Sequence, residues 1–171
     1  MHSYLQRTQQ AIDDAVRGMT PEQLAWHADG KWSAAAILEH LALTYRGTAK
    51  GMERCLQAGR PSATTAGFRV RVASFVVTGL RYMPSGRQSP AVVAPQGMAP
   101  ETVLETLRLH LAAADDALSR CEARFGAGVK IANHPFLGPL TARQWRTFHW
   151  VHARHHMKQI VRLRRQMGAA S

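Results

Sequence analysis

Apolar residues recur every three to four positions along most of this chain, which is the period of an amphipathic α-helix. The pattern is sustained in four long segments, at about residues 3–17, 34–58, 100–125 and 142–166. Gly18 and Gly59 follow the first two segments as stop signals, and Ser33 is placed to cap the second. Thr141 and Gln144 have the spacing of a capping box at the start of the fourth. We therefore expect four long helices.

Shorter elements lie between the long helices. Residues 20–23 (Thr-Pro-Glu-Gln) combine a Thr cap, a Pro at the first helical position and a capping-box Gln, so they predict a short helical turn through Trp26. Residues 67–83 are apolar enough for a strand or a helix, and their helical surroundings favour a helix. Residues 84–100, rich in Pro, Gly and Ser, predict an extended loop, which the sequence leaves open as a lid. A second loop is predicted at residues 126–140.

These elements indicate an all-α protein, a four-helix bundle with short extra helices whose middle connection is a long crossover. The 171 residues show no internal repeat and no linker, so we expect one domain over residues 1–171. No apolar run approaches the roughly 18–20 residues of a membrane span. The N-terminus lacks the apolar region of a signal peptide. We therefore expect a cytoplasmic protein in which Cys55 and Cys121 are reduced thiols.

The formal charge of +11 is unevenly distributed. No acidic residue occurs between Glu53 and Glu101 or after Glu122, although both stretches are rich in arginine. Such a surface concentrates anions and can bind nucleic acid or anionic lipid without sequence specificity. The basic residues are not interleaved with aromatics in a nucleic-acid motif, which favours simple solvation of the charges. Arg146 and Arg154 on the last helix are candidates for steering an anionic substrate towards a site.

The most informative chemistry lies in the last helix, where four of eight consecutive residues are histidine. His152 and His156 are four positions apart, so their side chains lie on one helical face with Cβ atoms roughly 5–6 Å apart. That separation lets two imidazoles reach one metal ion at about 2.0–2.1 Å. His149 lies at the edge of the same face, and His155 points to one side. The pattern predicts half of a metal site.

His40 is the natural third ligand because it lies within the apolar stripe of the second long helix. A buried imidazole without partners is costly, and a metal satisfies three of them together. His40, His152 and His156 would form a three-histidine site with an open position, as in catalytic zinc sites. Imidazole ligands suit Zn, Ni, Cu or Fe, so the divalent transition metal stays open. The alternative is that each is an ordinary helix-face histidine.

Three further residues are candidates for supporting the ligands. Gln159 and Glu39 lie one helical step from the proposed ligands and can orient them through hydrogen bonds, or belong to the surface or to a cap. His149 is a backup ligand or a hydrogen-bonding partner of the ligands. Because the Glu39 side chain should point about 100° away from His40, no general base is evident beside the three histidines.

Three segments resemble the DinB-like (DinB/YfiT-like) superfamily of metalloenzymes. Residues 31–41, KWSAAAILEHL, resemble the family's W-S-x-x-x-(I/V)-L-x-H-L segment. Residues 152–160, HARHHMKQI, resemble its H-x-x-H-H-x-x-Q-(I/L) ending. Residues 134–141, HPFLGPLT, are similar to a segment in a branch of unknown function. Together with the helix lengths, the resemblance spans nearly the whole chain.

The resemblance implies an up-down-down-up bundle with a divalent metal held by His40, His152 and His156. Characterised members of the superfamily include thiol-dependent S-transferases and a mycothiol-dependent isomerase, in which the metal lowers the pKa of the thiol. Homodimers are common among its members. The substrate does not carry over.

Three functions are compatible with the sequence. The leading hypothesis is a metal-dependent enzyme, a thiol transferase or a related activity, that activates a low-molecular-weight thiol or water and acts on a small molecule. The second is a non-catalytic metal- or ligand-binding stress-response module, which would bind metal without turnover. The third is a basic nucleic-acid-binding protein, whose binding would fall steeply with salt and would survive loss of the histidines.

Overall fold

A computed structural model describes residues 2–84 and 89–170. The four long helices are α1 (Ser3–Val16), α3 (Ala34–Ala58), α5 (Pro100–Phe125) and α6 (Ala142–Ala170). A short helix, α2 (Pro21–Ala25), joins α1 to α3. Part of the loop predicted at residues 84–100, residues 85–88, lies outside the described residues.

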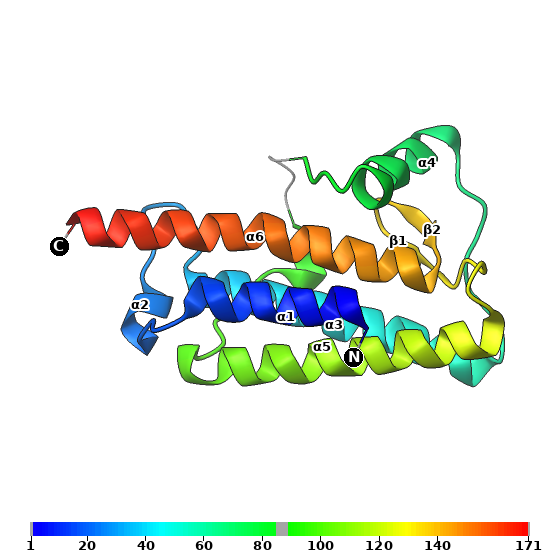
Figure 1. Cartoon of the computed structure of the whole chain (residues 1–171), viewed down its shortest axis with the longest axis horizontal. Helices are drawn as coiled ribbons and strands as arrows, with labels where there is room; N and C mark the ends of the chain where they lie inside the picture. The colour runs from blue at the N-terminus through cyan, green and yellow to red at the C-terminus, as the bar shows by residue number, and fades with distance from the viewer. Residues whose placement is uncertain (1, 85–88, 171) are drawn as a thin grey trace.

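The long helices form an up-down-down-up bundle (Figure 1). Helices α1 and α6 run one way and pack side by side, whereas α3 and α5 run the opposite way and pack as a parallel pair. A parallel pair cannot be joined by a tight turn, so the chain crosses back between the end of α3 and the start of α5. The expected all-α bundle with one long crossover is confirmed.

Local signals set the helix ends where the sequence predicts them. The Ser33 side chain accepts a hydrogen bond from the Ala36 N–H at 3.1 Å, and Gly59 ends α3 in the left-handed conformation with φ of 68°. The Thr141 hydroxyl accepts from the Gln144 N–H at 3.2 Å while the Gln144 side chain accepts from the Thr141 N–H at 3.1 Å. This reciprocal capping box fixes the start of α6 and hence the register of its histidines.

The core lies between the four long helices and is built from the predicted apolar stripes. Leu38, Leu41 and Tyr45 of α3 are fully buried, as are Leu107 and Leu111 of α5. Each such side chain contributes roughly 1.5–3 kcal/mol by leaving water. Among the described residues, no helix combines the length and the apolar character needed to cross a membrane.

The crossover contains short helical segments and sits beside the bundle. Helix α4 (Phe68–Ser74) continues into the π-helix η1 (Phe75–Gly79), so the helix expected at residues 67–83 is confirmed. A single 3₁₀ turn, η2 (Ala91–Val93), then lies against α3. The crossover thereby supplies one wall of the space above α3.

A β-hairpin replaces the loop predicted at residues 126–140. Strands β1 (Ala132–His134) and β2 (Gly138–Leu140) pair antiparallel, with Ala132 opposite Leu140. The expectation of a plain loop is wrong here because two three-residue strands are too short to show an alternating pattern. At Gly138, φ is 64° and a Cβ would lie 2.6 Å from Val70 Cγ1. The hairpin thus packs tightly beneath α4.

Candidate metal centre

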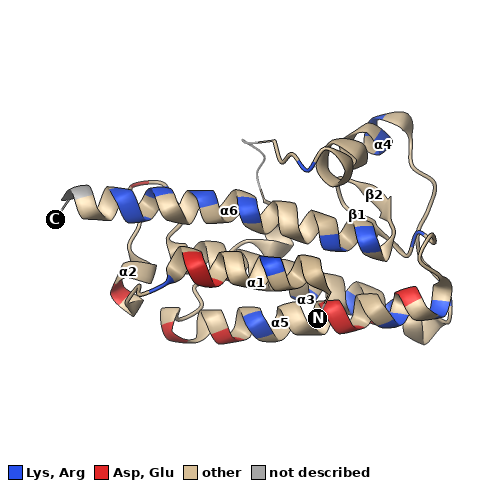
Figure 2. Ribbon diagram, in the orientation of Figure 1, with Lys and Arg blue, Asp and Glu red and all other residues tan. Residues whose placement is uncertain are grey.

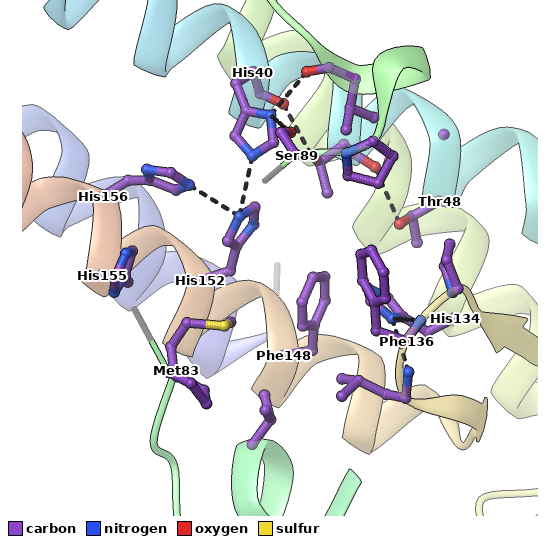
Figure 3. A pocket seen from close by; sticks show the side chains of 18 of the residues that line it. His40, Thr48, Met83, Ser89, His134, Phe136, Phe148, His152, His155 and His156 are labelled. Carbon is purple, nitrogen blue, oxygen red and sulfur yellow. Dashed lines mark hydrogen bonds between the residues drawn. The ribbon is translucent and has the colours of Figure 1, made fainter. Parts of the chain in front are cut away.

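Helices α3 and α6 bring three imidazoles to one point (Figure 3). His40 Nε2 lies 3.1 Å from His152 Nε2, which lies 3.0 Å from His156 Nε2. A ligand atom from each of these residues lies within 4.8 Å of the other two. The i,i+4 spacing on α6 and the inward position of His40 on α3 are what place them together.

Hydrogen bonds to Nδ1 fix the orientation and the protonated nitrogen of the His40 and His156 rings. His40 Nδ1 lies 2.8 Å from the Val93 carbonyl oxygen, and His156 Nδ1 lies 2.8 Å from Gln159 Oε1. Both oxygens only accept, so each Nδ1 carries the proton and each Nε2 presents a lone pair. The two lone pairs converge on His152 Nε2, which carries at most one proton. A single hydrogen bond therefore leaves one lone pair unsatisfied.

A divalent metal fits this donor set. Two imidazole nitrogens on a tetrahedral metal, each bonded at about 2.0–2.1 Å, lie roughly 3.3–3.4 Å apart. The observed separations of 3.0 and 3.1 Å are close to that value and require only a small outward shift of the rings. His152 Nδ1, which is buried, has no hydrogen-bond partner within the described part of the chain. The three-histidine cluster can hold a metal ion.

Burial keeps the three imidazoles neutral. Loss of solvent lowers the pKa of His40, although the bond to Val93 raises it slightly. Burial, followed by the proximity of His156 and His40, places the pKa of His152 well below 6.5. Burial also lowers the pKa of His156 to about 4. At neutral pH the three rings therefore offer lone pairs to a metal without first releasing protons.

Gln159 and Glu39 support the histidine cluster through hydrogen bonds, the first directly and the second through a loop. Gln159 accepts the His156 Nδ1–H bond described above, which orients that ring. Glu39 is 3% exposed and points away from the cluster, towards the loop before α5. Its carboxylate accepts backbone N–H bonds from Gln96, Gly97 and Met98 at 2.9, 3.0 and 2.9 Å. It thereby fastens the loop whose Val93 carbonyl holds His40.

His149 lies one turn before His152, outside the group of three. Its Nε2 is 3.1 Å from Thr48 Oγ1, and its ring packs against Tyr45 with centroids 4.9 Å apart. Complete burial lowers its pKa to about 3. The Thr48 hydroxyl itself donates to the Thr44 carbonyl, so the His149 ring donates to Thr48. His149 is thus held within the core of the bundle.

The two arginines expected to steer anions are placed elsewhere. Arg146 is 2% exposed and pairs with Glu122 and Asp115 of α5, so it has no free charge to offer a ligand. Arg154 is exposed and donates to the Arg81 carbonyl oxygen at 2.8 Å. Neither lines the cavity beside the histidines. Their position on α6 suggested this role, but the partners that hold them come from distant segments.

A cavity of about 1450 Å³ opens from the histidine cluster. Its walls come from α3, α4, η1, the β-hairpin and α6, with Phe148 and Phe136 facing the space (Figure 3). Four cationic side chains line it, and none of its described lining residues is an Asp or Glu. The cations are Lys31, Arg54, Arg69 and Arg162. The acid-free stretches of the sequence indicated this charge but not its location.

His134 is a lining residue that the sequence did not single out as part of the site. Its Nδ1 accepts the Phe136 and Leu137 N–H bonds at 3.2 Å, so its Nε2 carries the proton. Burial lowers its pKa to about 4. The ring packs on Phe148, which in turn stacks on His152. The hairpin places a neutral N–H donor in the cavity, and the HPFLG segment was its only sequence signal.

Of three comparisons with known proteins, one found a match. A search of curated proteins and a search of solved structures found no match. The family model of the DinB superfamily matches residues 4–160, which include all but the first residue of α1, the whole of α3 and α5, and the three histidines. Because the match covers most of the sequence and the bundle has the corresponding helix order, the chain belongs to the DinB superfamily.

Proposed function

We propose that this protein is a divalent-metal-dependent enzyme that activates a low-molecular-weight thiol, or water, for transfer to a small-molecule substrate. The observation that carries the proposal is the convergence of three neutral imidazoles on one point at the wall of a large cavity. A buried structural site would not need such access. A three-histidine donor set leaves a coordination position free for a reactant.

Different residues would hold the metal and orient the histidine rings that bind it. His40, His152 and His156 hold the metal, while Val93 and Gln159 fix the direction of two of the rings. Trp32 and Phe148 pack on His40 and His152 and keep these rings in place. A metal bound there lowers the pKa of a thiol or water and makes it a nucleophile near neutral pH.

The lining of the cavity favours a thiol over water. Hydrolysis by water usually needs a general base beside the metal, and no carboxylate belongs to the described lining. His134 and His155 line the cavity, but His134 Nδ1 already accepts the Phe136 and Leu137 N–H bonds, and His155 Nε2 accepts from the Gln159 side-chain amide at 3.4 Å. A thiol would need no separate base, because a metal held by the three histidines would lower its pKa enough for solvent water to take the proton.

Elemental analysis of untagged protein, purified without chelator, tests the metal site. We expect about one transition metal per chain in the wild-type protein and loss of that metal in His40→Ala and His156→Ala. His155→Ala, on the same helix but outside the cluster, is the matched control and should retain it. Metal retained in His156→Ala, or none bound after reconstitution with Zn, Ni, Fe and Mn, would refute the assignment.

The alkylation rate of small thiols then tests the chemistry. Metal-loaded wild-type protein should accelerate alkylation of at least one low-molecular-weight thiol at neutral pH, and His156→Ala should not. Stoichiometric metal without acceleration of any thiol, or of ester hydrolysis, would contradict the enzyme and leave a metal-binding module.

A further inference from the structure

The cavity extends far beyond the histidine cluster, along one face of α3. Residues lining it recur down this helix from His40 through Gly47 and Gly51 to Arg54. At 1.5 Å per residue, the fourteen residue-to-residue steps from His40 to Arg54 span roughly 21 Å. A site for a thiol and a small electrophile alone would not need that length. The far part of the cavity therefore has room for an extended ligand.

Two glycines open this face of α3. A Cβ added at Gly47 or Gly51 would meet no atom within 4 Å, because the space beside each is empty. Glycine inside a helix costs about 1 kcal/mol relative to alanine. Both glycines lie on the face of α3 that lines the cavity, so the stability of the helix is lowered at two positions there. The absence of side chains at these positions keeps the far part of the cavity clear.

The part of the cavity away from the histidines is lined by two arginines, Arg54 and Arg69. Arg54 lies near the end of α3 and Arg69 in the first turn of α4, and the chain enters α4 at the end of the bundle where α3 finishes (Figure 1). Neither forms an ion pair with a described residue, whereas Arg108 and Arg120 pair with acids of the bundle. The acidic residues of the long helices lie on α1, α3 and α5, and there are none on α4 or α6 (Figure 2). Because these two arginines have no acidic partner among the described residues and the described lining holds no Asp or Glu, the cavity favours binding of an anion.

Apolar side chains line the stretch between the two ends. Val72 and Val76 come from α4 and η1, Leu137 from the hairpin, and Phe148 from α6. The neutral His134 ring adds one hydrogen-bond donor among them. A largely apolar wall with a few placed polar groups is typical of a site for an organic ligand.

We propose that the cavity binds an elongated amphipathic anion, whose acidic group is attracted by the positive charge of Arg54 and Arg69 and whose apolar body lies against Val72, Val76 and Phe148. The opposite end of the ligand reaches towards the three histidines. Identifying that end as the reacting end rests on the proposed function, whereas the binding mode does not. The substrate class is therefore an organic acid with a long or aromatic apolar part.

Fluorescence titration with dansylaminoundecanoic acid tests this binding mode, and its methyl ester is the uncharged control. The wild-type protein should bind the acid at least tenfold more tightly than the ester. The Arg54→Gln/Arg69→Gln double variant should lose that preference. Arg60→Gln/Arg71→Gln makes the same charge change outside the cavity and should keep it. Equal binding of acid and ester by the wild type, or a preference that survives in Arg54→Gln/Arg69→Gln, would overturn the proposal.

Gly51→Leu tests where the apolar body lies. The leucine would fill empty space and raises helix propensity, so the bundle should fold with unchanged or higher melting temperature. It should weaken binding of acid and ester alike by at least tenfold. Unchanged binding in a folded Gly51→Leu protein would place the probe elsewhere and refute the binding mode.

Metal content measured on the same samples separates the two proposals. Full metal with no preference for the acid contradicts this inference alone. Absence of metal with normal preference for the acid contradicts the proposed function alone.

Discussion

Replacing Glu39 by Gln should loosen the loop before α5 and weaken the metal site. Glu39 Oε1 accepts the Gln96 N–H bond, and Oε2 accepts those of Gly97 and Met98. Glutamine is close in size but has one carbonyl oxygen and one amide nitrogen. Whichever way it turns, its NH₂ group faces at least one backbone donor. The substitution therefore removes at least one bond and the charge that strengthens the others.

The magnitude follows from the number of bonds. A hydrogen bond to a charged group contributes roughly 1.5–3 kcal/mol, against roughly 0.5–1.5 for a neutral one. Losing one charged bond and weakening two by about 1 kcal/mol each gives roughly 3–5 kcal/mol in total. At 1.4 kcal/mol for each factor of ten, amide exchange at Gly97 and Met98 should accelerate roughly 100-fold or more.

The effect should reach the metal because His40 depends on the same loop. The Val93 carbonyl accepts the His40 Nδ1–H bond, and it lies only three residues before Gln96. Removing the partner of a metal-ligating histidine typically costs 10–100-fold in metal affinity. A competition titration with a chromogenic chelator should show a loss of that size in Glu39→Gln.

Hydrogen exchange measured by mass spectrometry or NMR, beside the chelator titration, provides the assay. Glu105→Gln removes an exposed carboxylate from α5 and is the matched control, which should match the wild type in both measurements. Exchange at residues 96–98 and metal affinity that are both unchanged in Glu39→Gln would refute the reasoning that this carboxylate holds the loop and His40.

Two further predictions concern the fold. Gly138→Ala combines a left-handed φ of 64° with a Cβ 2.6 Å from Val70; the melting temperature should fall by about 5–12 °C for a cost of roughly 2–4 kcal/mol, whereas Gly128→Ala should change it little. For His149, burial holds the folded pKa at about 3, below its value in the unfolded chain, so its stabilisation is complete above about pH 6.5 and is lost as pH falls towards the folded pKa. Urea unfolding of metal-free protein should therefore lose up to roughly 1.4 kcal/mol per pH unit through this group. A His149→Phe variant with the same acid slope as the wild type would contradict this.

Much of the fold and the ligand cluster could be predicted because local signals specify them. The Ser33 cap and Gly59 bound α3 by short-range hydrogen bonds and backbone preference, so the helix predicted at about residues 34–58 agrees with the observed one. The spacing of His152 and His156 is a property of one helix. His40 needed only the additional premise that its apolar stripe faces the same core.

The features that the sequence did not predict depend on contacts between residues that are distant in sequence. Arg146 is as basic as any arginine on α6, and only the packing of α5 shows that Glu122 neutralises it. Conversely, Arg54 of α3 and Arg69 of α4 line the same cavity, and neither pairs with an acid among the described residues. The hairpin that positions His134 has too few residues for its pattern to stand out from a loop. Long-range packing, rather than local propensity, decided each of these positions.

The division between helices and connections has an evolutionary consequence. The three clustered histidines belong to α3 and α6, whose positions the bundle core fixes, while most of the apolar cavity wall comes from the crossover and the hairpin. Insertions and substitutions in those connections can change which molecules fit the cavity without moving the histidines. On the proposed function, the scaffold would therefore let substrate preference diverge while the metal site is inherited unchanged.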